Sequence, residues 1–357
     1  MLSEVEMTKL SGISTLNSNS LNVCFTMSFY MYFDVAMPLT LFAVTLLSVF
    51  LNNKAERKLK STLEEKEFQI KDTVLLVLAM GAAISLMVLI PQMAIMIIFL
   101  FSYSMLLFIF TYVFSDFRKT LAETFCLAFI IVSFALILLS FGLSMNGVMS
   151  VSAFSALLAF TFIALLYEEV RSSRGERWYL AVLPPALFVF LYMFLGGTPI
   201  WFPYLLDLYG VVFAVMITIY LGSLFTWRTS LIFVALLTVL DIILVLFTGT
   251  MVSAARHVSS LMLPVLISVP TVPRIMTQWG VLFMSLGLGD FFFAGLIAIQ
   301  SFKRFGKNFA VLSIFAMSVS FFIFETLILN LGFRAFPGTL MIICGWLPLV
   351  FLKKYIR

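Results

Sequence analysis

The chain has 357 residues, of which 62% are hydrophobic and only 11% are charged, and its formal net charge is +5. Soluble proteins contain about 45–50% apolar and about 25% charged residues. The composition therefore identifies an integral membrane protein and excludes a water-soluble enzyme.

The first 27 residues are polar, and we expect residues 1–27 to form a tail without a membrane span. Beyond them, each apolar block is long enough to cross a hydrocarbon core of about 30 Å as a helix. The predicted spans are 28–51, 73–90, 92–114, 121–143, 148–167, 179–195, 204–225, 229–248, 279–300, 308–330 and 336–352. The pair around Pro91 could instead form one re-entrant hairpin, so we predict an all-α bundle of 9–11 spans.

The distribution of basic residues predicts the orientation of these spans. With eleven spans, all but four of the 22 basic residues fall on one side of the membrane. Positive side chains in short loops are retained in the cytoplasm. We therefore expect the N-terminus outside and the C-terminus in the cytoplasm.

Several kinds of catalytic site are excluded by composition. His257 is the only histidine, so a zinc site of the His-Glu-x-x-His type cannot form. Cys24, Cys126 and Cys344 are far apart in the chain, and no phosphate-binding loop is present. We expect no cofactor, no metal and no nucleic-acid partner, and a lipid bilayer as the surroundings.

Acidic residues within apolar blocks are the informative positions, because a charge at mid-bilayer costs about 2.5–3.5 kcal/mol. Four acids in these blocks are candidates, Asp34, Asp241, Asp290 and Glu325. Asp34 lies close to its helix start, and Glu123 and Asp207 lie near span ends, which favours structural roles. Glu325 is deeper, and a structural hydrogen-bonding role is favoured there over proton handling.

Asp241 and Asp290 are predicted to lie at the same depth. Asp241 follows Thr229 by 12 residues and Asp290 precedes Gln300 by 10 residues. These intervals correspond to heights of about 18 and about 15 Å in a helix. Two antiparallel helices would bring the two carboxyls to one level near the middle of the membrane.

Two adjacent carboxyls can share one proton and hydrolyse an amide. The ionised aspartate takes a proton from the attacking water, and the protonated one hydrogen-bonds to the carbonyl oxygen. Gly287 and Gly289 flank Asp290. Because glycine is costly inside a helix, they indicate either close approach of backbone or substrate, or packing between helices.

These residues resemble the presenilin and signal peptide peptidase family of intramembrane aspartyl proteases. The family signature is Gly-x-Gly-Asp in one span and an aspartate, usually after tyrosine, in the preceding span. The matches are Gly287-Leu288-Gly289-Asp290 and Leu240-Asp241. The similarity covers about residues 200–348 and is closest to archaeal members. It implies N-terminal helices at 28–200, a catalytic region at 201–357 and a prokaryotic cell membrane.

The sequence departs from the family at three places. Leu240 replaces the usual tyrosine, and the Pro-Ala-Leu triplet of the last span is reduced to Pro337-Gly338 followed by Thr339. The family has nine spans, with the aspartates on the sixth and seventh, whereas eleven predicted spans place them on the eighth and ninth.

The resemblance also implies how the substrate is held. Transmembrane segments or signal peptides would be cleaved, and the predicted orientation matches signal peptide peptidase, which implies type II segments. Segment 249–278 is the candidate for β-type pairing with the substrate, or is an ordinary external loop. Pro337 and Gly338 would lie opposite the aspartates, with Pro337 leaving a backbone carbonyl unpaired.

Three other functions fit the sequence. A transporter or channel could use Asp241, Asp290 and Glu325 to relay protons or bind a cation. A prepilin-type peptidase also uses Gly-x-Gly-Asp, although its acids lie near the cytoplasmic face. A catalytically inactive relative could serve as a scaffold.

Overall fold

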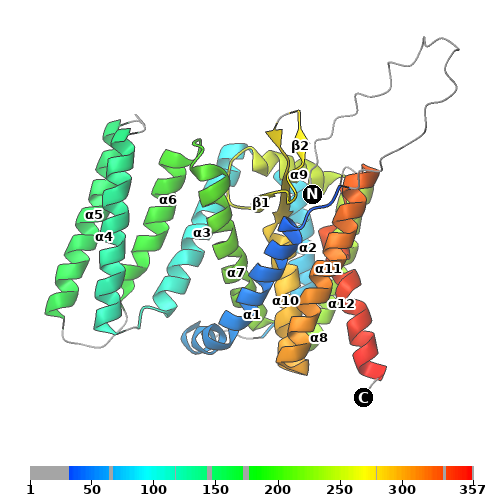
Figure 1. Ribbon diagram of the computed structural model, residues 1–357. Coiled ribbons are helices and arrows are strands. Elements are labelled where there is room, and N and C mark those ends of the chain that lie inside the picture. The colour runs from blue at the N-terminus through cyan, green and yellow to red at the C-terminus, as the bar shows by residue number, and fades with distance from the viewer. Residues whose placement is uncertain are drawn as a thin grey trace, which may run out of the picture.

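A computed structural model shows an elongated assembly of upright helices with a small β-hairpin near its upper side (Figure 1). The described residues are 32–63, 67–116, 118–142, 147–171, 177–278, 280–332 and 335–355. The predicted tail at 1–27 lies outside them.

The described part of the chain is largely helical. Its α-helices are α1 (Ala36–Leu63), α2 (Ile70–Met87), α3 (Gln92–Val113), α4 (Lys119–Gly142), α5 (Gly147–Val170), α6 (Leu183–Leu195), α7 (Leu206–Leu224), α8 (Trp227–Ile242), α9 (Thr250–Ser259), α10 (Leu288–Phe305), α11 (Lys307–Leu331) and α12 (Gly338–Tyr355). Short turns of other helix types adjoin three of them, η1 (Trp178–Val182), η2 (Trp201–Leu205) and η3 (Ile243–Phe247).

Eight helices among the described residues are long and apolar enough to cross a membrane. Two further apolar helical stretches are shorter, Ala36–Asn52 and Gly338–Lys353. The prediction of a polytopic all-α membrane bundle is therefore confirmed. Both α2 and α3, on either side of Pro91, belong to the eight, so each is long enough to cross the membrane by itself.

Helix α10 occupies the centre of the C-terminal bundle. Every side chain from Phe291 to Ser301 is buried, and α10 packs against α1, α7, α8 and α11. Helices α4 and α5 instead form a separate antiparallel pair at the far edge of the molecule (Figure 1). The core thus surrounds α10, while the outer helices present apolar side chains on their surface.

The predicted span 279–300 is wrong in its first part. Strand β4 (Phe283–Gly287) pairs antiparallel with β1 (Leu266–Pro270), and α10 begins only at Leu288. Strands β2 (Met276–Thr277) and β3 (Gly280–Val281) extend the same hairpin. A short apolar run has the same composition in a buried strand and in a helix, so hydropathy alone does not separate them.

Two acids hold the hairpin against the helices. Asp207 of α7 accepts a hydrogen bond of 2.7 Å from the backbone N–H of Ser268 in β1. Asp34 accepts one of 2.7 Å from the N–H of Val272 and caps the start of α1. The sequence analysis favoured structural roles for Asp34 and Asp207 because both lie near span ends. These hydrogen bonds are such structural roles.

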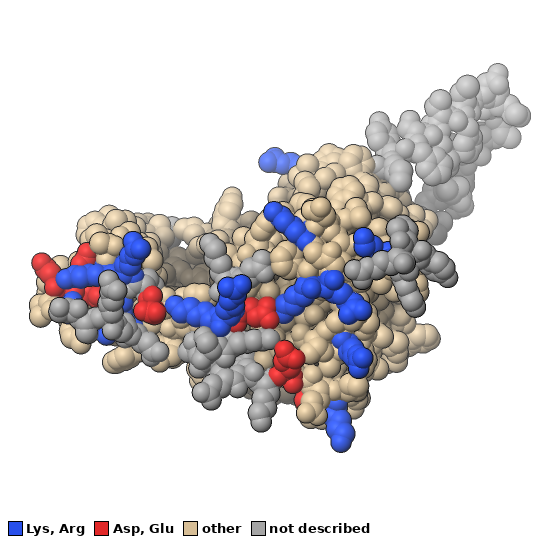
Figure 2. All heavy atoms as spheres, turned by 90° about the horizontal axis from the view of Figure 1, so that it is seen from below, with Lys and Arg blue, Asp and Glu red and all other residues tan. Residues whose placement is uncertain are grey.

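Basic side chains gather on one face of the molecule. Figure 2 shows the lower face, which carries a band of Lys and Arg with fewer Asp and Glu. Described residues at the helix ends on this side include Arg118, Lys119, Arg171, Arg228, Lys303, Arg304 and Lys307. We call this side the basic face.

Close packing between α11 and α12 depends on Gly345. A Cβ atom at this position would lie 2.2 Å from the backbone oxygen of Ala316. We expect Gly345→Ala to lower the free energy of unfolding by about 1–3 kcal/mol through overpacking. Thermal unfolding in detergent measures this, with Gly142→Ala as the control because a Cβ there meets nothing within 4 Å. Equal melting temperatures for the two variants would contradict the packing.

Candidate active site

Asp241 lies in the last turn of α8, where the helix changes its geometry. Helix α8 begins after Thr226, whose hydroxyl accepts a hydrogen bond from the N–H of Thr229. Asp241 is followed within two residues by the π-helical turn η3. Its side chain is half-buried. A π-turn is common where a helix is adapted to a functional site.

Asp290 lies in the first turn of α10, directly after strand β4. Gly287 is the N-cap residue in extended conformation, and its backbone N–H donates to the Asp290 carboxylate. An acid that bonds back to the N-cap N–H occupies the stabilising position of a capping box. The strand-to-helix junction therefore holds the carboxylate at the centre of the bundle.

The first turn of α12 contacts both aspartates. The Thr339 backbone N–H and Oγ1 donate to Asp241 Oδ2 at 3.2 and 2.6 Å. A Cβ atom on the neighbouring Gly338 would lie 2.5 Å from Asp290 Oδ1. Two consecutive residues thus touch one aspartate each, and the two carboxylates lie within electrostatic range of each other. The structure brings together Asp241, Asp290 and Gly338, and adds Thr339.

Sequence patterns assign no role to Thr339. It stands out only as the residue following Pro337-Gly338, since a threonine near a helix start usually serves the backbone of its own helix. Its 98-residue separation from Asp241 means that no local pattern reports this contact. The one signal that could have found it is its position within the altered Pro-Ala-Leu motif.

The carbonyl four residues before Pro337, which the missing proline N–H would leave unpaired, lies outside the described residues. Pro337 itself is buried and immediately precedes α12. Its own carbonyl accepts a hydrogen bond of 3.3 Å from the N–H of Met341. A proline just before a helix breaks no bond inside it, because the first N–H groups of a helix lack partners within that helix.

Leu240 points toward α2. A Cβ atom on Gly81 would lie 3.0 Å from Leu240 Cδ1, so Leu240 is in close contact with that glycine. The residue that replaces the tyrosine of the motif therefore contributes to packing between α8 and α2. Its neighbour Asp241 extends instead toward α12.

The two glycines of the motif have different surroundings. At Gly287 a Cβ atom would make ordinary contact with Asp290 Oδ2 at 3.4 Å, and Leu288 is buried. At Gly289, which is exposed, a Cβ atom would meet nothing within 4 Å. Helix packing does not explain Gly289, and the open space beside it lies next to Asp290.

Glu325 lies in α11, which carries neither Asp241 nor Asp290. It is fully buried in α11, and neither carboxyl oxygen has a hydrogen-bond partner among the described residues. The charged group within its electrostatic range is Asp34. Within the described ranges, no group of three His, Cys, Asp or Glu side chains could hold a metal ion.

No protein-family model, curated protein or solved structure matches this chain.

Charge repulsion between the aspartates leads to a prediction about stability. Asp290→Asn keeps an acceptor for the Gly287 N–H and removes the repulsion with Asp241, so we expect the melting temperature not to fall. Asp34→Asn is the contrasting variant. Its carboxylate accepts backbone bonds of 3.0, 3.2 and 2.7 Å with both oxygens, and an amide has only one acceptor oxygen. We expect a lower melting temperature there, because a hydrogen bond to a charged group contributes about 1.5–3 kcal/mol.

Thermal unfolding of both variants in the same detergent measures the difference. A fall for Asp290→Asn as large as that for Asp34→Asn would show that Asp290 is a structural acid.

Proposed function

We propose that this protein is an intramembrane aspartyl protease, with Asp241 and Asp290 as the catalytic residues. The supporting observation is the first turn of α12, where Thr339 bonds to Asp241 and Gly338 lies against Asp290. Paired carboxyls inside an apolar bundle can hydrolyse an amide without metal or thiol. The resemblance of the two aspartate motifs to the presenilin and signal peptide peptidase family supports the same assignment.

The hydrogen bonds assign different roles to the two acids. Asp241 accepts two hydrogen bonds from Thr339, and donors of this kind favour the ionised form of a carboxyl group. Asp241 takes a proton from water while the water oxygen attacks the substrate carbonyl carbon. Asp290 carries the shared proton and hydrogen-bonds to the carbonyl oxygen. Transfer of a proton to the amide nitrogen then breaks the C–N bond and releases a carboxyl and an amino end.

Strand β4 supplies a place for an unwound substrate. In an antiparallel pair, alternate residues direct their N–H and C=O groups to opposite sides. The N–H of Leu288 donates to Val265 O, and the N–H of Thr271 donates to Leu282 O. The even-numbered residues at this end of the chain segment therefore direct their backbone groups toward β1. Ser285 has an odd number, so its backbone N–H and C=O groups point away from β1. Among the described strands, β4 has no second neighbour. A substrate strand added at this edge would reach Asp290 three residues beyond the strand end.

We propose the outer edge of β4 as the place of substrate pairing, instead of segment 249–278, which the sequence suggested. Segment 249–278 contributes β1, which is the inner strand held by Asp207, and the exposed edge of the pair belongs to β4. The proposed substrates are transmembrane segments or signal peptides. With the basic face in the cytoplasm, α8 runs outward and α10 returns, which favours type II segments in a prokaryotic membrane.

The proposed activity is tested by cleavage of a labelled transmembrane peptide by the full chain in lipid vesicles, with products identified by mass. Fusion substrates of both orientations are compared, and we expect faster cleavage of type II segments. Asp241→Asn and Asp290→Asn should each abolish cleavage, because each removes one half of the proton exchange. Glu325→Gln is the matched control and should retain activity, since Glu325 interacts electrostatically with Asp34 and has no part in the proposed proton exchange.

Persistent cleavage by either aspartate variant would contradict the assignment. Absence of cleavage by the unaltered protein, with the fold intact, would instead favour the transporter alternative, in which all three acids act together.

Thr339 is proposed as a positioning residue for Asp241. Thr339→Val removes the hydroxyl donor and keeps the shape, so we expect kcat to fall about 10- to 100-fold, the equivalent of one hydrogen bond to a charged group. Thr339→Ser should restore most of the rate, with KM and melting temperature near those of the unaltered protein. A serine variant as slow as the valine variant would show that the methyl group, and not the hydroxyl, is needed.

A further inference from the structure

A second site lies on the basic face, where α8 begins and α10 ends. A cavity of about 520 Å³ opens there, within the usual size range of ligand pockets. Its lining includes four charged side chains, Glu56, Glu67, Lys303 and Arg304, together with Trp227 and Gln300. Trp227 precedes Asp241 by 14 residues, and Arg304 follows Asp290 by 14 residues, which corresponds to about 21 Å along each helix. The cavity is therefore separate from the proposed proteolytic site.

Hydrogen bonds between helices hold the walls of this cavity. Lys303 Nζ donates to Glu56 Oε1 at 2.8 Å, and Asn52 Nδ2 donates to Glu56 Oε2 at 3.0 Å. Lys303 and Glu56 thus form a neutral pair that joins α10 to α1. The buried Gln300 donates through Nε2 to the backbone oxygen of Phe225 at 2.7 Å, which joins α10 to the connection between α7 and α8. The cavity is therefore shaped before any ligand arrives.

Arg304 is stacked on aromatic rings and forms no ion pair among the described residues. Its Cζ atom lies 5.3 Å from the centre of the Trp227 ring and 5.9 Å from the centre of the Phe305 ring. Stacking covers a face of the planar guanidinium and leaves the N–H groups at its edge as donors. The guanidinium therefore offers the cavity a positive group that can bind an anion through two parallel hydrogen bonds.

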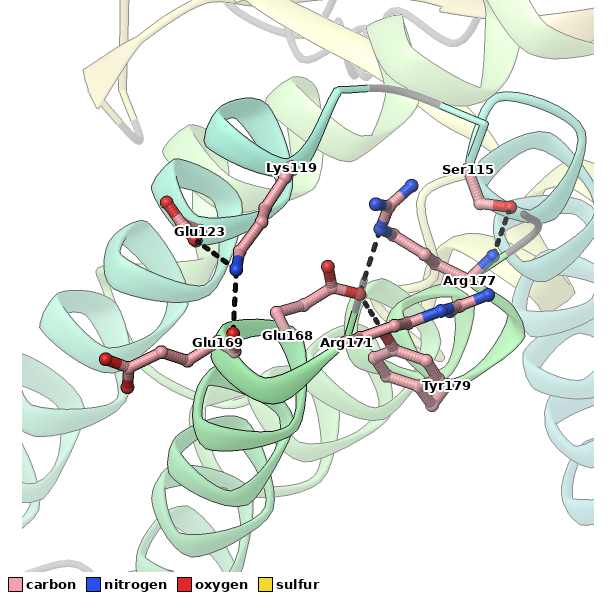
Figure 3. A network of polar contacts seen from close by, with 8 residues as sticks. All are labelled: Ser115, Lys119, Glu123, Glu168, Glu169, Arg171, Arg177 and Tyr179. Carbon is pink, nitrogen blue, oxygen red and sulfur yellow. Dashed lines mark hydrogen bonds and ion pairs between the residues drawn. The ribbon is translucent and has the colours of Figure 1, made fainter. Parts of the chain in front are cut away.

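Other charged side chains near the helix ends pair with their neighbours. Figure 3 shows Arg177 Nε bonded to Glu168 at 2.9 Å and Lys119 within 4.0 Å of Glu123. Glu67 lines the same cavity as Arg304, yet these two side chains form no such pair. The cavity therefore keeps an acidic and a basic group apart.

The position of Glu67 is set by the next residue in the chain. The backbone N–H of Phe68 donates to Leu224 O at 2.8 Å, and its ring packs edge-on against Phe225 with ring centroids 5.0 Å apart. Glu67 has a contact of its own within the protein, but a carboxylate accepts up to about four hydrogen bonds, so it can also bind an ammonium group. The arrangement fits a ligand with one negative and one positive group.

The surroundings of the cavity match the headgroup region of a bilayer. Trp227 is the first residue of α8, and tryptophan is enriched at the level of lipid headgroups. Leu231 follows it on the same face of the helix and is 38% exposed. A phospholipid can therefore place its headgroup in the cavity and its acyl chains along the apolar surface of α8.

We propose that this cavity binds the headgroup of phosphatidylethanolamine, with the phosphate at Arg304 and the ammonium at Glu67. Phosphatidylglycerol has no cation for Glu67. The trimethylammonium of phosphatidylcholine has no N–H to donate and is usually held by aromatic faces, whereas a face of Trp227 is already covered by Arg304. The site is independent of the proteolytic assignment.

The test uses the full chain in detergent with phosphatidylethanolamine that carries a photoreactive diazirine on one acyl chain. Peptides from the start of α8 should be labelled. Unlabelled phosphatidylethanolamine should compete at a concentration about threefold lower than phosphatidylcholine or phosphatidylglycerol with the same chains, as expected for ion pairs open to water.

Variants assign the two charges of the headgroup. Arg304→Gln and Glu67→Gln should each lower the labelling about threefold, with melting temperatures that show an intact fold. Glu67→Gln should also remove the preference over phosphatidylcholine. Arg118→Gln and Glu169→Gln are the matched controls, exposed charged residues that do not line the cavity, and should leave the labelling unaltered.

Competition by the unaltered protein's other ligands decides between the alternatives. Equal competition by all three phospholipids would reduce the contact to surrounding lipid and overturn the proposal. Stronger competition by phosphatidylglycerol would overturn it in favour of an anion site at Arg304. Glycerophosphoethanolamine lacks the acyl chains and should compete poorly, and equal competition by it would overturn the lipid assignment in favour of a water-soluble ligand.

Discussion

The first turn of α12 is the contact on which the centre of this protein depends. Thr339 supplies two donors to Asp241, and Gly338 leaves room for the Asp290 carboxylate. A carboxylate in an apolar bundle is costly unless donors surround it. Because consecutive residues serve different aspartates, a shift of α12 along its axis would disturb both acids together.

The intramembrane and interfacial acids differ in the partners that the fold gives them. Asp34 and Asp207 accept backbone N–H groups and hold the hairpin in place, which is a structural use of a carboxylate. Asp241 and Asp290 lie close to each other, an arrangement that repulsion makes unfavourable for stability alone. Unfavourable charge arrangements of this kind are a sign of a functional site.

The β-hairpin connects the upper surface of the molecule in Figure 1 with Asp290. It is anchored at α1 and α7, and β4 leads without a break into the helix that carries Asp290. An unpaired strand edge is normally protected in proteins because it invites pairing with another chain. In the proposed protease, the edge of β4 would pair with the substrate strand.

The sequence by itself determined the membrane bundle and singled out the two aspartates as candidate site residues. The thickness of the bilayer fixes the length of an apolar helix, and the cost of a buried charge makes isolated acids stand out. Tertiary structure alone decided that residues 283–287 form a strand, because a short apolar run fits a buried strand or a helix equally well. It alone assigned Thr339 to Asp241 and Leu240 to Gly81, since both contacts join helices far apart in the chain. Local patterns report periodicity and composition, whereas such contacts arise only when the helices have packed.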